Sequence, residues 1–243
     1  MNRTITLTFS ESVENHVGME IIGKKCQTGF SPEKCRELAQ RYSCGELYEL
    51  NFPKKRLNLP EACIVVFRDG LKNIFGIDKD ALLEEQSSLE WDTKAYMYGR
   101  VVNKNARYNL CYADYSREPD YENKKGRILS FDDLPITKDV RENLCLFGRE
   151  FEDLYAEGNY YYDTKKCYIG YHGDSERRKV IGVRLGDEFP LHFKWYQNGE
   201  ETNQKITIPL RGGDIYIMSE KATGNDWKKR GISLRHAAGI KIK

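Results

Sequence analysis

The clearest candidate for chemistry in this sequence is the segment 171–175, which reads Tyr-His-Gly-Asp-Ser. It ends a predicted strand, and residues two apart on an extended backbone point to the same side. His172 and Asp174 could therefore reach one metal ion together. Two histidines and one carboxylate on one face of an octahedral ion leave three positions free, which is the arrangement in non-haem iron(II) oxygenases. The pattern predicts such a site if the chain supplies a second histidine.

The sequence has four histidines, so the choice of the third ligand is narrow. His16 has no motif around it, and His192 follows Asp174 closely, on what should be a neighbouring strand of the core. His236 lies far downstream in the last predicted strand, after enough chain to complete a sheet and return to the site. We therefore expect His172, Asp174 and His236 to bind the metal. The competing interpretation is a chance His-x-Asp pattern, because an isolated histidine near a strand end is more often a surface or hydrogen-bonded core residue.

Short strands are expected to position these residues. Six segments after residue 155 show strand character and are separated by turn signals such as Asn198-Gly199. They are residues 167–171, 179–185, 191–195, 205–210, 214–218 and 233–242. A helix is expected before them over residues 137–155, because large apolar residues recur there at helical spacing. A series of short strands is typical of a sandwich or jelly roll, a scaffold that suits a small buried metal site.

The first 94 residues mix helix and strand signals and are expected to form an α+β extension to a core that spans residues 95–243. Strands are predicted at residues 4–9 and 63–67, and helices are predicted to begin near Ser31 and Asp78. The basic segment 53–56 could contact a partner or a substrate. A structural cap on the core is the simpler interpretation of this extension.

The composition describes a globular protein that stays inside the cell. Hydrophobic residues make up 40% and charged residues 31% of the chain, and no apolar run approaches the ~18 residues of a membrane helix. The N-terminus lacks the pattern of a signal peptide, so a cytoplasmic or nuclear location is expected. Seven scattered cysteines without a Cys-x-x-Cys pair indicate free thiols. Because the net charge is only +2, binding of DNA or RNA would have to depend on local basic patches.

Several sequence blocks follow one another between residue 98 and the C-terminus. They are Tyr98-Gly99-Arg100, Ala106-Arg107-Tyr108, Tyr112-Ala113-Asp114, Asn159–Asp163, Ile169–Asp174, Val180–Gly186, Ile208-Pro209-Leu210 and Gly213–Met218. This ordered set resembles the AlkB family of iron(II)- and 2-oxoglutarate-dependent dioxygenases. The resemblance implies a double-stranded β-helix (jelly-roll) core with flanking helices. It also implies iron(II) and 2-oxoglutarate as cofactors, and hydroxylation or oxidative demethylation of a modified base in DNA or RNA.

The resemblance further implies which residues hold 2-oxoglutarate. Asn159 and Tyr161 would donate hydrogen bonds to it. In the family, the distal histidine is followed by a strand with two arginines that bind this co-substrate, and here the sequence departs from the pattern. Too few residues follow His236 for that strand, so the carboxylates would pair with Arg235, Lys241 or another basic group. Arginine would be preferred for two parallel hydrogen bonds to a carboxylate, whereas lysine supplies a point charge.

A nucleic-acid substrate would require basic side chains near phosphates and an aromatic side chain that stacks on an extruded base. The candidates for these contacts are Arg100, Arg107, Tyr108, Tyr112, Arg177 and Arg178. Such residues also commonly solvate a surface or pack against a sheet. A second alignment stays open, in which residues 226–229 match the family's distal-histidine segment and no histidine falls there.

Two alternative functions remain open at this level. One is the same chemistry on a protein side chain or a small metabolite, which the near-neutral net charge favours. The other is a degenerate jelly roll that binds nucleic acid or a partner without turnover, which the missing C-terminal arginine suggests.

Overall fold

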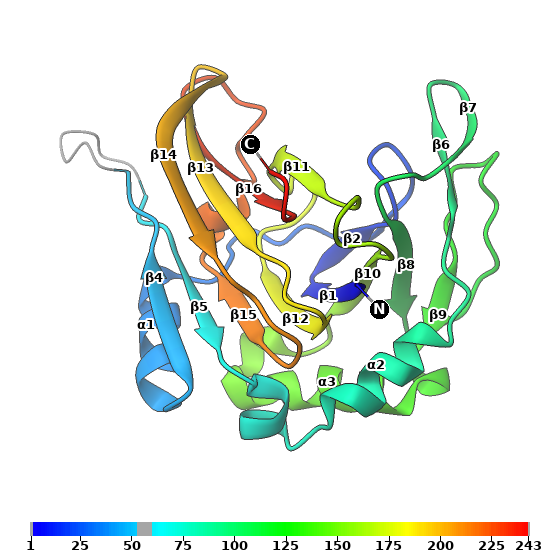
Figure 1. The fold of residues 1–243 in the computed structure, drawn as a ribbon, viewed down its shortest axis with the longest axis horizontal. Coiled ribbons are helices and arrows are strands. Elements are labelled where there is room, and N and C mark those ends of the chain that lie inside the picture. The colour runs from blue at the N-terminus through cyan, green and yellow to red at the C-terminus, as the bar shows by residue number, and fades with distance from the viewer. Residues whose placement is uncertain (1, 53–59, 243) are drawn as a thin grey trace.

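Two β-sheets that enclose a shared apolar core form the body of the protein (Figure 1). The computed structural model describes residues 2–52 and 60–242. The large sheet contains, in spatial order, β4 (Gly45–Glu49), β5 (Cys63–Phe67), β15 (Ile215–Met218), β12 (Val180–Gly186), β1 (Thr4–Ser10), β10 (Tyr155–Tyr161), β8 (Tyr108–Ala113) and β9 (Ile128–Ser130). The small sheet contains β11 (Ile169–His172), β16 (Ile232–Ala238), β13 (Leu191–Gln197) and β14 (Glu200–Ile208). Neighbouring strands are antiparallel, except for the parallel pair β8 and β9.

Hairpins and helices complete the fold. The hairpins pair β2 (Ser12–Glu14) with β3 (Ile21–Gly23) and β6 (Lys94–Met97) with β7 (Arg100–Asn103). The α-helices are α1 (Pro32–Arg41), α2 (Lys79–Ser87) and α3 (Pro135–Asn143). The shorter helices are the π-helix η1 (Leu71–Phe75) and the 3-10 helices η2 (Phe131–Asp133), η3 (Leu144–Phe147), η4 (Arg149–Phe151) and η5 (Glu220–Thr223). Helices α2 and α3 run along one face of the large sheet, and α1 lies against β4 and β5 (Figure 1).

The side chains of β1 alternate between two interior regions of the protein. Ile5, Leu7 and Phe9 are fully buried in the core between the large sheet and the helices. Thr6 and Thr8 point to the opposite side, toward the small sheet. Successive residues of a strand face opposite sides, so one strand serves both interiors. The strand predicted at residues 4–9 is thus confirmed, and it lies in the middle of the large sheet between β10 and β12.

The helix starts predicted in the N-terminal part are also confirmed. The Ser31 hydroxyl accepts a hydrogen bond of 3.1 Å from the backbone N–H of Lys34, at the start of α1. The Asp78 carboxylate accepts one of 2.7 Å from the N–H of Asp80, at the start of α2. Short polar side chains in this position satisfy N–H groups that have no partner within the helix.

The predicted boundary between residues 94 and 95 does not coincide with a boundary between sheets. Strands β1 and β5 precede it, yet β1 pairs with β10 and β12, and β5 pairs with β15, all of which follow it. β4 joins the same sheet through β5. The basic segment 53–56 lies outside the described residues. All seven cysteines lie within them and are free thiols, as predicted. Among the described residues, no helix combines the length and apolar character needed to cross a membrane.

The helix predicted over residues 137–155 is wrong in its second half. α3 ends at Asn143, and the chain continues through η3 and η4 before β10 begins at Tyr155. Gly148 has a φ of 140°, a conformation that other residues rarely adopt and that interrupts the helical path. The apolar residues whose spacing suggested the helix are nonetheless fully buried; they are Val140, Leu144, Phe147 and Phe151. Their spacing therefore predicted burial correctly and continuous helix incorrectly.

The six strands predicted after residue 155 are present, with shifted ends. Residues Asn198 and Gly199 join β13 to β14 with φ values of 54° and 89°, which is the pair of left-handed conformations that a two-residue hairpin turn favours. β16 ends at Ala238, short of the predicted residue 242. The described part of the protein is therefore mostly β, with two main sheets that are largely antiparallel and with few helices, as a sandwich or jelly roll would be.

Candidate metal centre

The small sheet brings His172, Asp174 and His236 together. His172 is the last residue of β11 and lies directly opposite His236 on β16. Nε2 of His172 is 3.6 Å from Oδ1 of Asp174, and Nε2 of His236 is 3.7 Å from the same oxygen. Each residue offers a donor atom within 4.8 Å of the others. An ion bound at about 2 Å from each donor needs donors roughly 3 Å apart, so small side-chain rotations would complete the set.

The loop that carries Asp174 requires a glycine between the two ligands. A Cβ atom on Gly173 would lie 2.1 Å from the backbone oxygen of Gly224, which is far inside van der Waals contact. The backbone N–H of Asp174 donates a 3.0 Å hydrogen bond to the carbonyl of Thr223. The close approach of these two loops therefore fixes the direction in which the Asp174 side chain leaves the backbone.

Burial keeps both histidines neutral, as metal ligands must be. Nδ1 of His172 lies 2.8 Å from the carbonyl oxygen of Gly170, which accepts its proton and leaves Nε2 free to face Asp174. Removal from water lowers the pKa of His172 to about 4 and that of His236 well below its ordinary value. The same desolvation raises the pKa of Asp174 to about 8. A bound cation would favour the ionised carboxylate, so the donor set fits a divalent metal in both type and electrostatics.

Arg177 lies behind Asp174 and is only 3% exposed. Its Nη2 is 2.6 Å from Oε2 of Glu157 and 2.6 Å from Oε1 of Glu176. Its Nε is 3.6 Å from Oδ2 of Asp174, the oxygen that does not face the histidines. The guanidinium therefore orients the metal-binding carboxylate and is enclosed by three acidic side chains. This corrects the predicted substrate contact of Arg177, because the charge has no access to a substrate.

A pocket of about 60 Å³ lies between the two sheets at the ligand cluster. Its walls are formed by Thr6, Thr8, Glu157, Asn159, Tyr161, Ile169, His172, Asp174, Val180, Arg184, Leu191, Tyr216, Met218, His236 and Ala238. One enclosed water needs roughly 10–15 Å³ of cavity volume, so the pocket has room for about five waters or one small organic acid. The pocket thus suits a small ligand that lies beside the metal.

Asn159 and Tyr161, which the resemblance implies as hydrogen-bond donors to 2-oxoglutarate, both line this pocket. The Asn159 amide oxygen accepts hydrogen bonds from Nε of Arg107 at 2.6 Å and from Nδ2 of Asn109 at 2.8 Å. Its amide nitrogen donates to Glu157 at 3.1 Å. The asparagine is therefore held firmly in the wall, and Arg107 reaches the same corner of the site.

The two basic residues predicted to bind 2-oxoglutarate do not line the pocket. Arg235 lies on β16 next to His236 and therefore faces the opposite side of the small sheet. There its guanidinium stacks 3.9 Å from the ring centre of Tyr196 and 5.2 Å from that of Trp227. Lys241 is exposed beyond the end of β16. The geometry therefore does not support a contact of either residue with a ligand in the pocket.

The basic residue that does line the pocket is Arg184 on β12, which the sequence analysis missed. Its neighbours on the strand are apolar, in the run Val180–Gly186. An arginine inside a buried strand is itself the signal, because charged residues are almost never fully buried without a partner.

The residues predicted to contact a nucleic acid lie in different environments. Tyr112 is fully buried on the helix side of the large sheet, where its hydroxyl donates to Gln86 at 2.6 Å, so it cannot stack on a substrate. Tyr108 stacks on Tyr162 with ring centres 4.6 Å apart. Arg178 forms an ion pair with Glu220. Arg100 is exposed on β7 and Arg107 is half-buried, which leaves both available at the surface.

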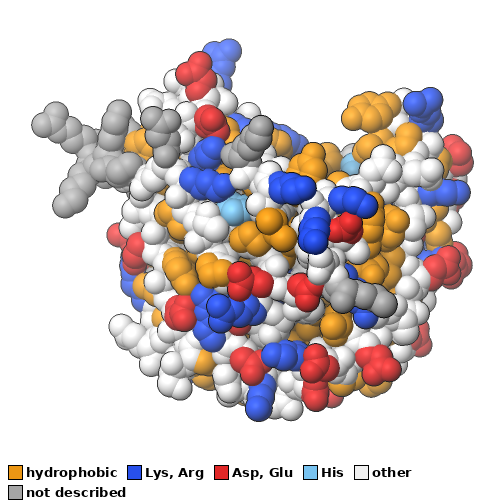
Figure 2. All heavy atoms as spheres, viewed as in Figure 1, with side chains coloured by type: hydrophobic (Ala, Val, Ile, Leu, Met, Phe, Trp, Pro, Cys, Tyr) orange, Lys and Arg blue, Asp and Glu red, His pale blue; other side chains and the backbone are white. Residues whose placement is uncertain are grey.

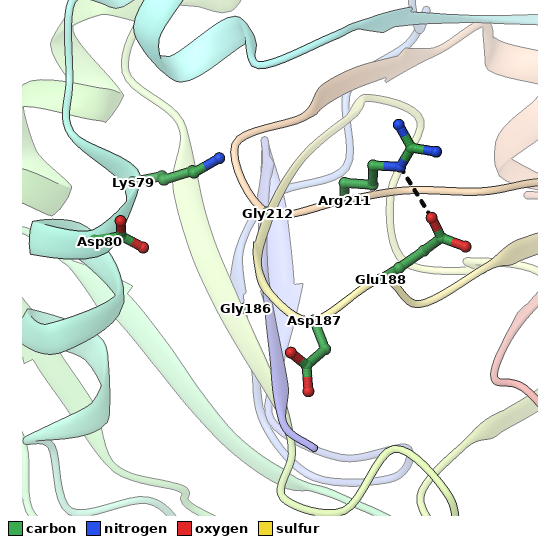
Figure 3. Close-up of a pocket in the computed structure, with 7 residues that line it drawn as sticks. All are labelled: Lys79, Asp80, Gly186, Asp187, Glu188, Arg211 and Gly212. Carbon is green, nitrogen blue, oxygen red and sulfur yellow. Dashed lines mark hydrogen bonds and ion pairs between the residues drawn. The ribbon is translucent and has the colours of Figure 1, made fainter. Parts of the chain in front are cut away.

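A larger cavity of about 440 Å³ lies away from the ligand cluster, at the turns before β13 and β15 (Figure 3). It is lined by Lys79, Asp80, Gly186, Asp187, Glu188, Arg211 and Gly212. Arg211 and Glu188 form an ion pair of 2.9 Å across part of it, and Lys79 and Asp80 lie on the opposite wall (Figure 3). Its charged side chains do not converge on one point, so the smaller pocket is the better candidate for chemistry.

Comparison with known proteins gives one extensive similarity. No family model matches the sequence. The chain is 46% identical, over 247 aligned residues, to "Uncharacterized protein R156" of Acanthamoeba polyphaga mimivirus. The alignment covers 98% of this chain and 96% of the viral protein. The likeness therefore includes the N-terminal segment as well as the part of the chain that carries the ligand cluster.

Proposed function

We propose that this chain, which belongs to the same family as the mimivirus protein, is an iron(II)- and 2-oxoglutarate-dependent dioxygenase. The observation that carries the proposal is the buried cluster of His172, Asp174 and His236 beside a small pocket. Two neutral imidazoles and one carboxylate on one side of an ion are the donor set of this enzyme class. The remaining positions on the ion would face the pocket, where a 2-oxo acid and oxygen could bind.

We further propose that the two sheets form a double-stranded β-helix in which β1 takes the place of the strand expected after the distal histidine. β16 is the last strand in the described part of the chain. β1 comes from the opposite end of the sequence, lies between β10 and β12, and turns Thr6 and Thr8 toward the ligand cluster. In this arrangement β1 would form part of the pocket wall on the large-sheet side.

The residues of the site would bind the metal, orient its ligands and exclude bulk water. When bound, iron(II) and 2-oxoglutarate supply an oxidation in which the 2-oxo acid becomes succinate and carbon dioxide while oxygen is inserted into a C–H bond. His172 and His236 would donate neutral nitrogen lone pairs, and Asp174 would supply the negative charge. Arg177 would hold Asp174 in position. The apolar side chains of the two sheets would keep bulk water from the reacting atoms.

For the substrate, we propose a modified base in DNA or RNA, as the AlkB-like sequence blocks suggest. Lys and Arg side chains gather over the C-terminal segment and β11 in the view of Figure 2. Arg100 and Arg107 add positive charge on β7 and at the edge of the site. Basic side chains near a site attract phosphates through a salt-dependent interaction. The same chemistry on a protein side chain or small metabolite is the alternative.

Succinate formation tests the proposal. The purified protein is incubated with iron(II), 2-oxoglutarate, ascorbate and oxygen, with and without methylated oligonucleotides, and succinate is measured. His236→Ala removes a proposed ligand, whereas His192→Ala removes a histidine whose ring bonds to Thr207 and the Gly239 carbonyl. We expect iron-dependent succinate from the wild type and from His192→Ala only. Absence of succinate in every condition would point instead to a binding module without turnover.

The salt dependence of binding separates the proposed substrate from its alternative. If the substrate is a nucleic acid, the logarithm of its affinity should fall linearly with the logarithm of the salt concentration. Succinate formation without salt-dependent binding of oligonucleotides would favour a protein side chain or a small metabolite.

A further inference from the structure

Arg184 presents a buried positive charge to the pocket that holds the ligand cluster. It is 1% exposed and lies in the middle of β12. Across the strands, Arg184 is directly opposite Thr6 of β1, which in turn is directly opposite Asn159 of β10. Directly paired residues point to the same side of a sheet, so the three side chains form one row on the large-sheet wall. The metal ligands belong to the small sheet and its adjoining loop. The guanidinium of Arg184 and the proposed metal site therefore lie on opposite walls of the pocket.

The hydrogen-bonding capacity of Arg184 is mostly unused by the protein. A guanidinium has five N–H donors. Within the described residues, Nη1 of Arg184 donates to the Thr6 hydroxyl and Nε has no partner. No carboxylate of those residues forms an ion pair with it, and the nearby Asp214 is engaged by Arg68 at 2.8 Å. A buried charge without a counter-ion lowers stability, and a bound anion would offset this loss.

The surroundings of Arg184 are shaped for a small polar ligand. A Cβ atom on Gly182 would lie 1.9 Å from the ring of Tyr216, so only glycine lets this ring lie across the strand. The Tyr216 ring is thereby held in the pocket wall over Gly182, which lies two residues before Arg184 on β12. Thr6, Asn159 and Tyr216 all carry polar groups, so the wall around the guanidinium is neutral and polar. Glu157 also lines the pocket, but its carboxylate is paired with Arg177 at 2.6 Å, so the Arg184 guanidinium is left to attract an anion.

We propose that Arg184 binds the distal carboxylate of 2-oxoglutarate while the 2-oxo acid end reaches the metal. This inference rests on the proposed function. The planar guanidinium can donate two parallel hydrogen bonds to a carboxylate. β12 would thereby supply the positive charge that the resemblance leads us to expect from Arg235, Lys241 or another basic group. The site would thereby select a five-carbon di-acid over 2-oxo acids that have only one carboxylate.

Calorimetric titration of the manganese(II)-loaded protein tests this assignment without turnover. Each protein is titrated with 2-oxoglutarate and with 2-oxovalerate, which has the same chain length and a methyl group in place of the distal carboxylate. The wild type should bind 2-oxoglutarate at least about 30-fold more tightly than 2-oxovalerate, as expected for a charge-assisted pair. In Arg184→Met this preference should fall to within about threefold, through loss of 2-oxoglutarate affinity alone. Arg184→Lys should be intermediate, since it keeps the charge without the planar fork.

Two controls keep the test decisive. Arg235→Met removes the arginine stacked on Tyr196, outside the pocket, and should leave the preference of the wild type unchanged. The unfolding midpoint of ligand-free Arg184→Met should be equal to or higher than that of the wild type, because the substitution removes an uncompensated buried charge. A lower midpoint would show that the charge is already balanced within the protein and would overturn the inference.

The outcomes separate this inference from the proposed function. If the wild type binds both acids with equal affinity, the assignment of Arg184 is wrong while the metal site and its 2-oxo acid stand. If Arg184→Met weakens both acids equally, the arginine shapes the pocket and does not pair with the distal carboxylate, which also overturns the assignment. If neither acid binds the metal-loaded wild type, the proposed function and the inference fail together.

Discussion

Replacing Arg177 with methionine removes the cation that pairs with Glu157 and Glu176 and lies beside Asp174. The guanidinium has a side-chain exposure of 4%, and the carboxylates of Asp174, Glu157 and Glu176 are exposed by 12–13%. Removing one partner of a buried ion pair leaves an uncompensated charge and typically lowers stability by about 3–5 kcal/mol. We expect Arg177→Met to lower the free energy of unfolding of the metal-free protein by this amount, measured by urea denaturation.

The adjacent residue provides a matched control for this prediction. Arg178 has a side-chain exposure of 29% and a single acidic partner, Glu220. A partly exposed ion pair of this kind contributes up to about 1 kcal/mol, so Arg178→Met should have a small effect. In the double variant Arg177→Met with Glu176→Gln, part of the loss should be recovered, because one of the repelling carboxylates is gone.

Metal binding gives a second measure of the role of Arg177. A residue that orients a metal ligand typically changes metal affinity by about 10–100-fold when removed. We expect a loss of this size for manganese(II) in Arg177→Met and none in Arg178→Met. Equal losses of stability in Arg177→Met and Arg178→Met would refute the reasoning, because burial of the Arg177 ion pairs would then make no difference to the free energy of unfolding.

Three further predictions concern the site loop, a buried amine and the helix-side core. Gly173→Ala should lower the free energy of unfolding by about 1–3 kcal/mol, because its Cβ would overlap a backbone oxygen; Gly170→Ala, whose Cβ meets no described atom within 4 Å, should change it by less than about 0.5 kcal/mol in the same urea titration. Desolvation lowers the pKa of Lys104 to about 7. Between pH 7 and 9 the unfolded chain therefore binds more protons than the folded protein. The free energy of unfolding should rise with pH in this range, by up to about 1.4 kcal/mol per pH unit relative to Lys104→Met. Tyr112→Phe leaves buried Gln86 without its donor and should lower stability by about 1–3 kcal/mol while leaving oligonucleotide binding, measured by fluorescence anisotropy, unchanged.

The ligand cluster could be predicted from sequence because its determinants are local. His172 ends β11 and Asp174 follows two residues later in the adjoining loop, so the two ligands are close along the chain, and a final strand returns His236 to them. The structure pairs the two histidines directly across β11 and β16, as that reasoning requires. The N-cap of α1 at Ser31 and the turn at Asn198 were predictable for the same reason, since each depends on neighbouring residues alone.

Features that depend on distant parts of the chain could not be predicted in this way. The alternation in β1 indicates a strand with two different faces, but it does not reveal that β10 and β12 flank it. Arg177 and Arg178 are neighbours in sequence, yet Arg177 is enclosed by acidic side chains from its own loop and from β10, whereas Arg178 pairs with Glu220 nearer the surface. The resemblance implies Arg235, Lys241 or another basic group as the partner of the 2-oxoglutarate carboxylates, whereas alternation along β16 turns Arg235 to the opposite side of the sheet.

The most direct test of the central claim is anaerobic addition of iron(II) and 2-oxoglutarate to the protein while the visible spectrum is recorded. We expect a weak charge-transfer band in the wild type and in His192→Ala, and its loss in His172→Ala, Asp174→Ala and His236→Ala. A wild type without the band, or a band that persists when any of the three proposed ligands is removed, would contradict the proposed metal site.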